Sequence, residues 1–417
     1  MSTYLSLPKD KIRILLLEGV HDSAVALLKA SGYENVVRHK GALEGDALEK
    51  ALEGVHIVGI RSRTQLTKEV IEKADRLMAI GCFCIGTNQV DLEAARMNGI
   101  PVFNAPYSNT RSVAELVVGE IVMLMRRIFP RSVACHEGEW NKSATNSWEV
   151  RGKTLGIVGY GSIGSQLSVL AEAFGMRVLY YDVVDKLGHG NASAVGTLDE
   201  LLAESDVVSL HVPQLPTTKN LMGEAQIRAM KKGSFLINNA RGNVVDLDAL
   251  AAALKDGHLL GAAIDVFPKE PKGPADKLAT PLMGLDNVIL TPHIGGSTAE
   301  AQERIGVEVA RKLVEYSDVG STFGAVNFTG VQLPQSPRGT RFMHVHQNIP
   351  GMMMRLNEIF LHETCNVTAQ FLQTDGDIGY VVIEADTGHN TDLDDRILAA
   401  LRSLEGTIRA RLIYKGR

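Results

Sequence analysis

Unbroken runs of apolar residues alternate with amphipathic segments over the first 130 positions of the chain. The unbroken runs are typical of buried strands, and segments whose apolar residues recur every three or four positions are typical of helices with one buried face. This alternation predicts a parallel sheet with helices packed against it. The expected strands are residues 11–18, 56–60, 77–80 and 101–103, and the expected helices are residues 23–31 and 113–126.

A second alternating region predicts a second, larger sheet. Its strands are separated by helical or loop segments, which is the pattern of a six-stranded doubly wound sheet. A long helix at residues 299–316 then places Ile305, Val309 and Leu313 on one face, which would return the chain to the first domain. We therefore expect a substrate-binding domain of residues 1–107 and 300–331 and a nucleotide-binding domain of residues 108–299. The expected strands of the second sheet are residues 154–158, 178–182, 207–212, 235–238, 262–265 and 288–291.

The last part of the chain has a different order of elements. Residues 332–340 are rich in proline and glycine and predict a linker, in which Pro337 restricts the backbone. The order strand, helix, strand, strand, helix, strand follows at residues 341–346, 352–362, 366–373, 379–385, 394–404 and 407–414. This βαββαβ order predicts a ferredoxin-like domain over residues 341–417. Its edge strands favour pairing with another copy, although a purely packing role remains an alternative.

A glycine-rich turn joins the first strand of the second sheet to the helix that follows it. In Gly159-Tyr-Gly161-Ser-Ile-Gly164, Gly159 permits a tight turn, Gly161 lets the backbone approach a pyrophosphate, and Gly164 allows close helix packing. Asp182 ends the next strand, 21 residues after Gly161, where its carboxylate can bind both ribose hydroxyls and repel a 2′-phosphate. The unit predicts NAD binding in preference to NADP, and a turn that binds nothing is the weaker alternative.

Three charged residues follow strands of this sheet, at the edge where open α/β sheets bind their ligands. They are Arg241, Glu270 and His293. Oxidation of a 2-hydroxy acid needs a base for the hydroxyl proton, a cation for the carboxylate and an acceptor for hydride. We expect His293 to be the base, Glu270 to orient its ring, and Arg241 to bind the carboxylate. Singly, each residue is also compatible with a surface ion pair or a structural loop histidine.

Several motifs resemble those of the D-2-hydroxyacid dehydrogenase family. The stretches around Arg241, Glu270 and His293 read Asn239-Ala-Arg-Gly, Asp265-Val-Phe-Pro-Lys-Glu-Pro and Thr291-Pro-His-Ile-Gly-Gly296. Residues 59–64, 80–91 and 104–115 are similar to the branch of bacterial D-3-phosphoglycerate dehydrogenases that carry a C-terminal ACT domain. The resemblance covers nearly the whole chain.

The resemblance implies NAD-dependent oxidation of D-3-phosphoglycerate to 3-phosphohydroxypyruvate, the first step of L-serine synthesis. Some relatives of this type also reduce 2-oxoglutarate to 2-hydroxyglutarate. The implied cofactor contacts are Gly159, Gly161, Ser162, Ile163, Gly164, Asp182, Asn239, Ala240, Arg241, Asp265, His293, Ile294, Gly295 and Gly296. The implied substrate contacts are Arg61, Ser62, Arg63, Asn109 and Lys142, for which solvated surface polarity is the alternative.

In the third domain, the resemblance implies an L-serine effector site formed by His346, Asn348 and Asn366 between paired ACT domains. Two departures from the family pattern put serine affinity in question, because Thr364 stands where a glycine is usual and Ile349 where relatives have arginine. The family pattern also implies a homotetramer, in which Trp140 would meet the neighbouring subunit.

Composition narrows the remaining possibilities. The chain has 417 residues, 45% of them apolar, and a formal net charge of −5, which does not favour a nucleic-acid or membrane partner. Four irregularly spaced cysteines and no export signal or membrane span favour a reducing cytoplasm, and no metal site is expected. Another hydroxyacid dehydrogenase, acting on glyoxylate, hydroxypyruvate or 2-oxoglutarate, and a non-catalytic NAD(H)-sensing protein remain alternative functions.

Overall fold

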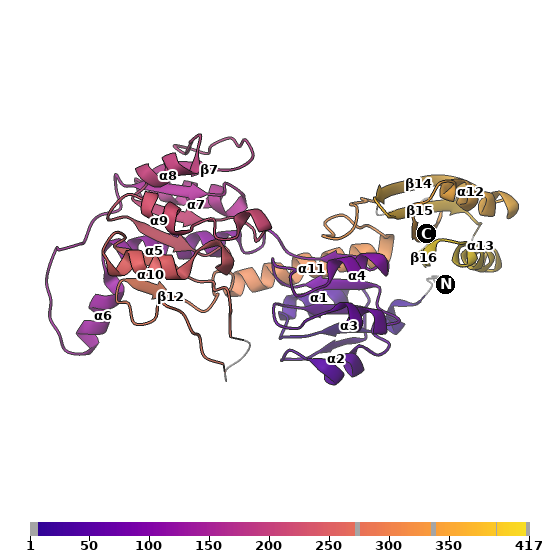
Figure 1. Ribbon diagram of the computed structural model, residues 1–417. Coiled ribbons are helices and arrows are strands. Elements are labelled where there is room, and N and C mark those ends of the chain that lie inside the picture. The colour runs from indigo at the N-terminus through magenta and orange to yellow at the C-terminus, as the bar shows by residue number, and fades with distance from the viewer. Residues whose placement is uncertain (1–6, 272–275, 335–338, 389, 414–417) are drawn as a thin grey trace. The chain divides into compact units, whose positions relative to one another are not determined.

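The computed structural model describes residues 7–271, 276–334, 339–388 and 390–413. The chain forms two compact units (Figure 1). One unit contains Met1–Ser108 and Gln302–Arg417, and the other contains Asn109–Ala301. Each unit is built around a parallel sheet, and the first also carries an antiparallel sheet.

The first unit begins with a five-stranded parallel sheet in the order β2-β1-β3-β4-β5. Its strands are β1 (Ile14–Leu16), β2 (Val36–Arg38), β3 (Ile57–Ile60), β4 (Ala79–Cys82) and β5 (Val102–Phe103). Its helices are α1 (Asp22–Ala30), α2 (Gly45–Leu52), α3 (Lys68–Lys73) and α4 (Leu92–Met97), after the 3-10 turn η1 (Lys9–Lys11). Strand β1 is shorter than the strand predicted at residues 11–18, and β4 lies slightly later in the chain than the strand predicted at residues 77–80. Strand β2 was not predicted, because it is largely exposed.

Helix α11 (Ala299–Val319) packs on this first sheet. Ile305, Val309 and Leu313 are buried in one cluster with Ile14 and Phe103, as their spacing predicts. Gly81 makes the close approach possible, because a Cβ atom there would lie 2.9 Å from the side chains of both Val309 and Leu313. The helix is therefore part of the core of the first unit.

The second unit contains a seven-stranded parallel sheet in the order β12-β11-β10-β9-β6-β7-β8. The prediction of a six-stranded sheet missed β8, because Ser193–Ala194 is an exposed two-residue strand with no apolar run. The strands are β6 (Thr154–Val158), β7 (Arg177–Tyr181), β8 (Ser193–Ala194), β9 (Val207–Leu210), β10 (Phe235–Asn238), β11 (Gly261–Ile264) and β12 (Val288–Leu290). The helices are α5 (Thr110–Met125), α6 (Ile128–His136), α7 (Ser162–Ala173), α8 (Leu198–Glu204), α9 (Glu224–Ala229) and α10 (Leu247–Lys255), with the 3-10 turns η2 (Pro216–Thr218) and η3 (Gly242–Val244).

Side-chain caps fix the beginnings of several helices. Asp91, Thr197, Asp246 and Asn390 each accept a hydrogen bond from a backbone N–H in the first turn of the helix that follows. Such a bond satisfies a donor that has no partner within the helix and contributes about 1 kcal/mol. The helix boundaries are therefore encoded locally.

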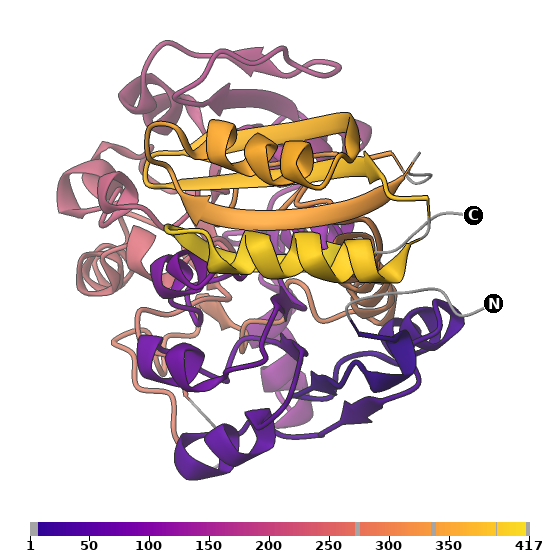
Figure 2. The same ribbon diagram turned by 90° about the vertical axis from the view of Figure 1, so that its right-hand side faces the viewer.

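The antiparallel sheet of the ACT domain has the order β14-β15-β13-β16. Its elements are β13 (Thr340–Gln347), α12 (Met352–His362), β14 (Asn366–Asp375), β15 (Ile378–Asp386), α13 (Thr391–Ser403) and β16 (Thr407–Ile413), which confirms the βαββαβ prediction. Both helices cover the same face of the sheet (Figure 2), where Phe342 and Phe360 form a buried aromatic pair. Residues 335–338, which include Pro337, lie outside the described residues.

None of the helices within the described ranges combines the length and apolar character needed to cross a membrane.

Candidate active site

The loops after β10, β11 and β12 lie at one edge of the second sheet, because neighbouring parallel strands end on the same side. They carry Arg241, Glu270 and His293. The Nδ1 atom of His293 lies 3.0 Å from each of the two carboxylate oxygens of Glu270. The structure therefore brings the predicted base and its orienting carboxylate into direct contact.

The backbone of His293 has φ of 55°, a left-handed conformation that residues other than glycine seldom adopt. Asp265, which is 1% exposed, holds it there. The carbonyl oxygen of Asp265 accepts from the N–H of His293 at 2.8 Å, and its carboxylate accepts from the N–H groups of Ile294 and Gly295, both at 2.8 Å. The hydroxyl of Thr291 donates to the same carboxylate at 2.6 Å. A buried aspartate thus fixes the loop that presents His293.

The contact between His293 and Glu270 shifts the proton affinity of both groups. The hydrogen bond and negative charge of Glu270 raise the pKa of His293 above its ordinary value, against the effect of partial burial. Burial alone would raise the pKa of Glu270, but the hydrogen bond and charge of His293 outweigh it and lower that pKa. The pair therefore favours an imidazolium beside a carboxylate, which is what a base needs as it takes a proton.

Arg241 completes the group of charged residues. Its Nη1 donates to the carbonyl oxygen of Ala240 at 2.7 Å, and its positive charge contributes to lowering the pKa of Glu270. A guanidinium at this place offers the two parallel donors that bind a carboxylate. The structure thus assembles Arg241, Glu270 and His293 at one sheet edge, and their arrangement suits proton abstraction next to a bound carboxylate.

The glycine-rich turn has the geometry of a dinucleotide cradle. Gly159 has φ of 93°, and a Cβ atom there would lie 2.6 Å from the carbonyl oxygen of His211. A Cβ atom on Gly164 would lie 2.3 Å from the carbonyl oxygen of Gly159, so a side chain is excluded at both positions. By contrast, a Cβ atom on Gly161 would meet open space, at the N-terminus of α7 where Ser162 and Ile163 begin the helix. These residues fit a pyrophosphate held at a helix N-terminus.

Asp182 lies next to this turn. One carboxylate oxygen accepts from the N–H of Tyr160 at 2.8 Å and the other accepts from the N–H of Val184 at 3.0 Å. The half-exposed side chain therefore links the glycine-rich turn to the end of β7, and keeps acceptor capacity for the hydroxyls of a ribose.

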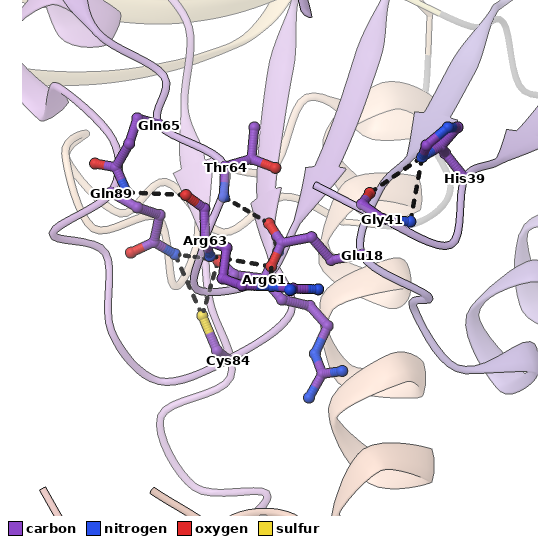
Figure 3. Close-up of polar contacts among 9 residues, drawn as sticks. All are labelled: Glu18, His39, Gly41, Arg61, Arg63, Thr64, Gln65, Cys84 and Gln89. Carbon is purple, nitrogen blue, oxygen red and sulfur yellow. Dashed lines mark hydrogen bonds and ion pairs between the residues drawn. The ribbon is translucent and has the colours of Figure 1, made fainter. Parts of the chain in front are cut away.

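In the first unit, the predicted anion-binding arginines lie on a turn organised by Glu18 (Figure 3). The Glu18 carboxylate accepts from the backbone N–H groups of Arg61, Arg63 and Thr64 at 3.2, 3.0 and 2.8 Å. Its Oε2 also lies 3.9 Å from Nε of Arg63. The sequence interpretation missed Glu18, because its partners lie 43 to 46 positions away along the chain.

The loop after β2 also contacts the residues around Glu18 through its backbone. The carbonyl oxygens of His39 and Gly41 accept from the backbone N–H groups of Gly19 and Glu18, both at 3.0 Å. Lys40 lies between them in the chain and is exposed, as are Ser62 and Arg63.

The remaining predicted substrate residues belong to the second unit. Asn109 is 9% exposed and lies against Gly296, where a Cβ atom would approach its amide nitrogen to 2.7 Å. Lys142 is exposed in the segment between α6 and β6, near Trp140, whose exposed fraction is 88%. Asn109 is therefore part of the sheet edge that carries His293, whereas Lys142 is on the surface of the unit.

The three residues predicted to bind L-serine are not all together within one chain. His346 is 2% exposed near the end of β13, opposite Gly379, and Asn348 donates to the carbonyl oxygen of Gly376 at 2.9 Å. Asn366 starts β14 opposite Asp386, at the other end of the same sheet. One ACT domain thus offers His346 and Asn348 at one end and Asn366 at the other.

Comparison with known proteins places the chain among dehydrogenases. Residues 118–295 match the model of the family "D-isomer specific 2-hydroxyacid dehydrogenase, NAD binding domain", and residues 342–409 match "AHAS small subunit-like ACT domain". The chain is 58% identical to D-3-phosphoglycerate dehydrogenase of Haemophilus influenzae, over 99% of this chain and 100% of the relative. It is 56% identical to D-3-phosphoglycerate dehydrogenase of Escherichia coli strain K12, over 98% of this chain and 99% of the relative.

A solved structure shows the same fold. The crystal structure of D-lactate dehydrogenase from Aquifex aeolicus, complexed with NAD and lactic acid, is 31% identical and has a TM-score of 0.65. The match covers 73% of this chain and 95% of that chain.

Proposed function

The chain belongs to the D-isomer specific 2-hydroxyacid dehydrogenase family, and on that basis we propose that it oxidises D-3-phosphoglycerate to 3-phosphohydroxypyruvate, the first step of L-serine synthesis. It is an NAD-dependent dehydrogenase with a C-terminal ACT domain. The observation that carries the proposal is the contact of His293 with Glu270 beside Arg241, in a chain that matches the full length of named phosphoglycerate dehydrogenases.

In the proposed mechanism, His293 removes the proton of the substrate hydroxyl. Its Nδ1 is occupied by Glu270, so Nε2 is the atom that accepts this proton. Glu270 stabilises the imidazolium that forms, and Arg241 binds the substrate carboxylate through two parallel hydrogen bonds. The glycine-rich turn and Asp182 would hold NAD, which would supply the acceptor for the hydride on the carbon that carries the hydroxyl. In the reverse direction, His293 returns its proton to the new hydroxyl.

The substrate phosphate requires cations outside this trio. Arg61 and Arg63 lie on the turn fixed by Glu18 in the first unit, and we assign phosphate binding to them, with Ser62 as a polar contact. Buried Glu18 supports this role, because a carboxylate that accepts three backbone N–H groups fixes the turn that carries both arginines. The same two arginines would bind the second carboxylate of 2-oxoglutarate in place of the phosphate. For Asn109 and Lys142 in the second unit, a substrate contact stays a prediction from the family resemblance.

Feedback inhibition by L-serine is the second part of the proposal. Since His346 and Asn366 lie at opposite ends of one ACT sheet, a site that uses both requires a second ACT domain in antiparallel orientation. Strand β14 is an edge of the sheet with a largely exposed face, which supports pairing of this kind. With a second contact between nucleotide-binding domains near Trp140, such pairing gives a homotetramer.

Thr364 supports a functional serine site less well than glycine would. Its φ is 50°, a left-handed conformation that a β-branched residue adopts at a cost of about 1 to 2 kcal/mol. The residue immediately precedes the buried Cys365 and the start of β14. The Thr364→Gly variant therefore reports whether this strain weakens binding of serine by Asn366.

The deciding experiment measures NADH formation from D-3-phosphoglycerate, and NADH consumption with phosphohydroxypyruvate and 2-oxoglutarate, each with and without L-serine. Turnover of the phosphorylated pair that serine suppresses, and that Asn366→Ala makes insensitive to serine, supports both parts of the proposal. Turnover indifferent to serine removes the effector site and leaves the reaction. Preference for glyoxylate or hydroxypyruvate contradicts the substrate assignment, and NADH binding without turnover of any acid contradicts the enzymatic function.

A further inference from the structure

A carboxyl group is buried directly behind the candidate active site. Glu120 lies on α5, on the side of the helix that packs on the second sheet, and is 2% exposed. Its Oε2 accepts from the side-chain Nδ2 of Asn239 at 2.8 Å. Asn239 is 7% exposed and follows β10 directly, two positions before Arg241. The contact therefore joins α5 to the turn that carries Arg241.

The other oxygen of each group has no hydrogen-bond partner among the described residues. These atoms are Oε1 of Glu120 and Oδ1 of Asn239, and both are shielded from solvent. If Glu120 were ionised, both atoms would be buried acceptors without a donor, which is unfavourable because neither regains the hydrogen bonds it loses to water. A protonated carboxyl removes this conflict, because its O–H can donate to Oδ1 while its carbonyl oxygen accepts from Nδ2.

The charges around Glu120 act in the same direction. Asp265, which directly follows β11, acts electrostatically on Glu120, and its carboxylate is negatively charged as an ionised Glu120 would be. Glu115, on the exposed side of the same helix, is paired with Arg111 at 2.5 Å. Burial raises the pKa of Glu120 to about 8, and the charge of Asp265 adds to this effect against the hydrogen bond from Asn239. A neutral carboxyl is therefore favoured at pH 7.

We propose that Glu120 is a protonated carboxylic acid that positions the turn from Asn239 to Arg241 through two hydrogen bonds with the amide of Asn239, and that loss of its proton limits activity at alkaline pH. Glu120 is a positioning residue, because it acts on Arg241 and Ala240 through Asn239 and not on the substrate. When the proton leaves, the carboxylate faces the amide oxygen and the like charge of Asp265, so the turn is displaced. The proposal rests on the dehydrogenase function for its activity readout.

Glu120→Gln is the informative variant. A glutamine amide provides one donor and one acceptor at every pH, so it preserves the two-bond pairing with Asn239 but does not ionise. The rates of the wild type and of the variant are compared from pH 6.5 to 9.5, with kcat and KM determined separately at each pH. We expect Glu120→Gln to stay within about threefold of the wild type at pH 7 and to retain activity above pH 8, where the wild type loses it.

The control is Glu115→Gln, which removes an exposed carboxylate from the same helix and should leave the profile unchanged. Coincident alkaline limbs in the wild type and Glu120→Gln would overturn the proposal. So would a loss of more than tenfold at pH 7 in a Glu120→Gln protein that is folded and binds NADH normally, because the negative charge would then be required.

A spectroscopic measurement tests the protonation without relying on activity. Infrared spectra of wild-type protein labelled with carbon-13 at glutamate carboxyl groups should show a protonated carboxyl at pH 7 that disappears as the pH rises through about 8, and this band should be absent from Glu120→Gln. If Glu120→Gln does not fold, the wild-type titration decides alone. Absence of a protonated glutamate at pH 7 overturns the proposal, whatever substrate the enzyme prefers.

Discussion

Replacing Glu270 with glutamine should lower the pKa of His293 and move the acid limb of the pH profile. The substitution keeps the size of the side chain and one hydrogen-bond acceptor for Nδ1 of His293. It removes the negative charge of the carboxylate, whose two oxygens each lie 3.0 Å from Nδ1. The hydrogen bond with Glu270 is the largest cause of the raised pKa of His293, and the negative charge of Glu270 adds to it. The direction of the expected change therefore follows directly from the structure.

The magnitude follows from Coulomb's law with solvent screening. Two unit charges 4 Å apart interact by about 1 kcal/mol in bulk water and about 4 kcal/mol at an effective dielectric constant of 20. The side chains of His293 and Glu270 are 49% and 38% exposed, so the coupling lies nearer the lower figure, at roughly 1 to 2 kcal/mol. This coupling is lost in Glu270→Gln, so the pKa of His293 should fall.

The assay is the pH dependence of kcat/KM for oxidation of D-3-phosphoglycerate. Oxidation needs unprotonated His293, so its acid limb should move to lower pH in Glu270→Gln. The plateau should fall about tenfold, because the imidazolium is less stabilised. Glu204→Gln, which removes a carboxylate from a surface pair with Arg177, should leave the profile unchanged. An acid limb that stays in place, or moves to higher pH, refutes this account of the pair.

The same shifts define a window of stability. The raised pKa of His293 adds stability that is complete below its ordinary value of 6.5 and is lost as pH rises through the raised value. The lowered pKa of Glu270 adds stability that is complete above its ordinary value of 4.5 and is lost as pH falls through the lowered value. The ion pair therefore stabilises the fold between these two folded-state pKa values.

Four further variants test other parts of the account. Arg241→Lys should reduce kcat/KM about 10- to 100-fold, because it removes a bidentate contact of roughly 1.5 to 3 kcal/mol, and a loss under threefold in initial-rate measurements would argue against that contact. Asp182→Ala should reduce the preference for NAD over NADP, measured as the ratio of kcat/KM values, by about tenfold or more, and an unchanged ratio would remove its ribose role. Arg61→Ala should raise KM for D-3-phosphoglycerate about tenfold or more while changing turnover of non-phosphorylated D-glycerate little, and equal effects on both acids would contradict phosphate binding. Glu120 has a folded-state pKa of about 8 against an ordinary 4.5, so its contribution to stability is complete below about pH 4.5 and is lost as pH rises through 8. The free energy of unfolding of the wild type, measured with urea between pH 5 and 8, should therefore decline by up to about 1.4 kcal/mol per pH unit, and Glu120→Gln should lack this decline. Equal pH slopes in the wild type and Glu120→Gln would contradict the protonated state of Glu120.

The sheet architecture and the candidate trio follow from local patterns in the sequence. Apolar runs identify the buried strands of the second sheet, and Arg241, Glu270 and His293 stand in the loops directly after three of them. Parallel pairing then brings those loops to one edge, so position along the chain is enough to predict proximity. The glycine-rich turn is equally local, because Gly159 and Gly164 exclude side chains within a single strand-turn-helix unit.

The residues that support the site could not be predicted in this way. Glu18 acts on a turn 43 to 46 positions away, and Glu120 acts on Asn239 over a separation of 119 positions. In the sequence each is one carboxylate among many, and only tertiary packing distinguishes it. Strand β8 was missed for a different reason, since its two exposed residues carry no apolar pattern and depend on pairing with β7.

The central claim is that His293 is the base of an NAD-dependent oxidation, held by Glu270. The most direct test measures NADH formation from D-3-phosphoglycerate by wild-type and His293→Ala protein, with NADH affinity determined on the same samples. The account predicts that His293→Ala loses about 100- to 10,000-fold in turnover while NADH affinity is retained. Turnover within a few fold of the wild type, with NADH affinity intact, would contradict the claim.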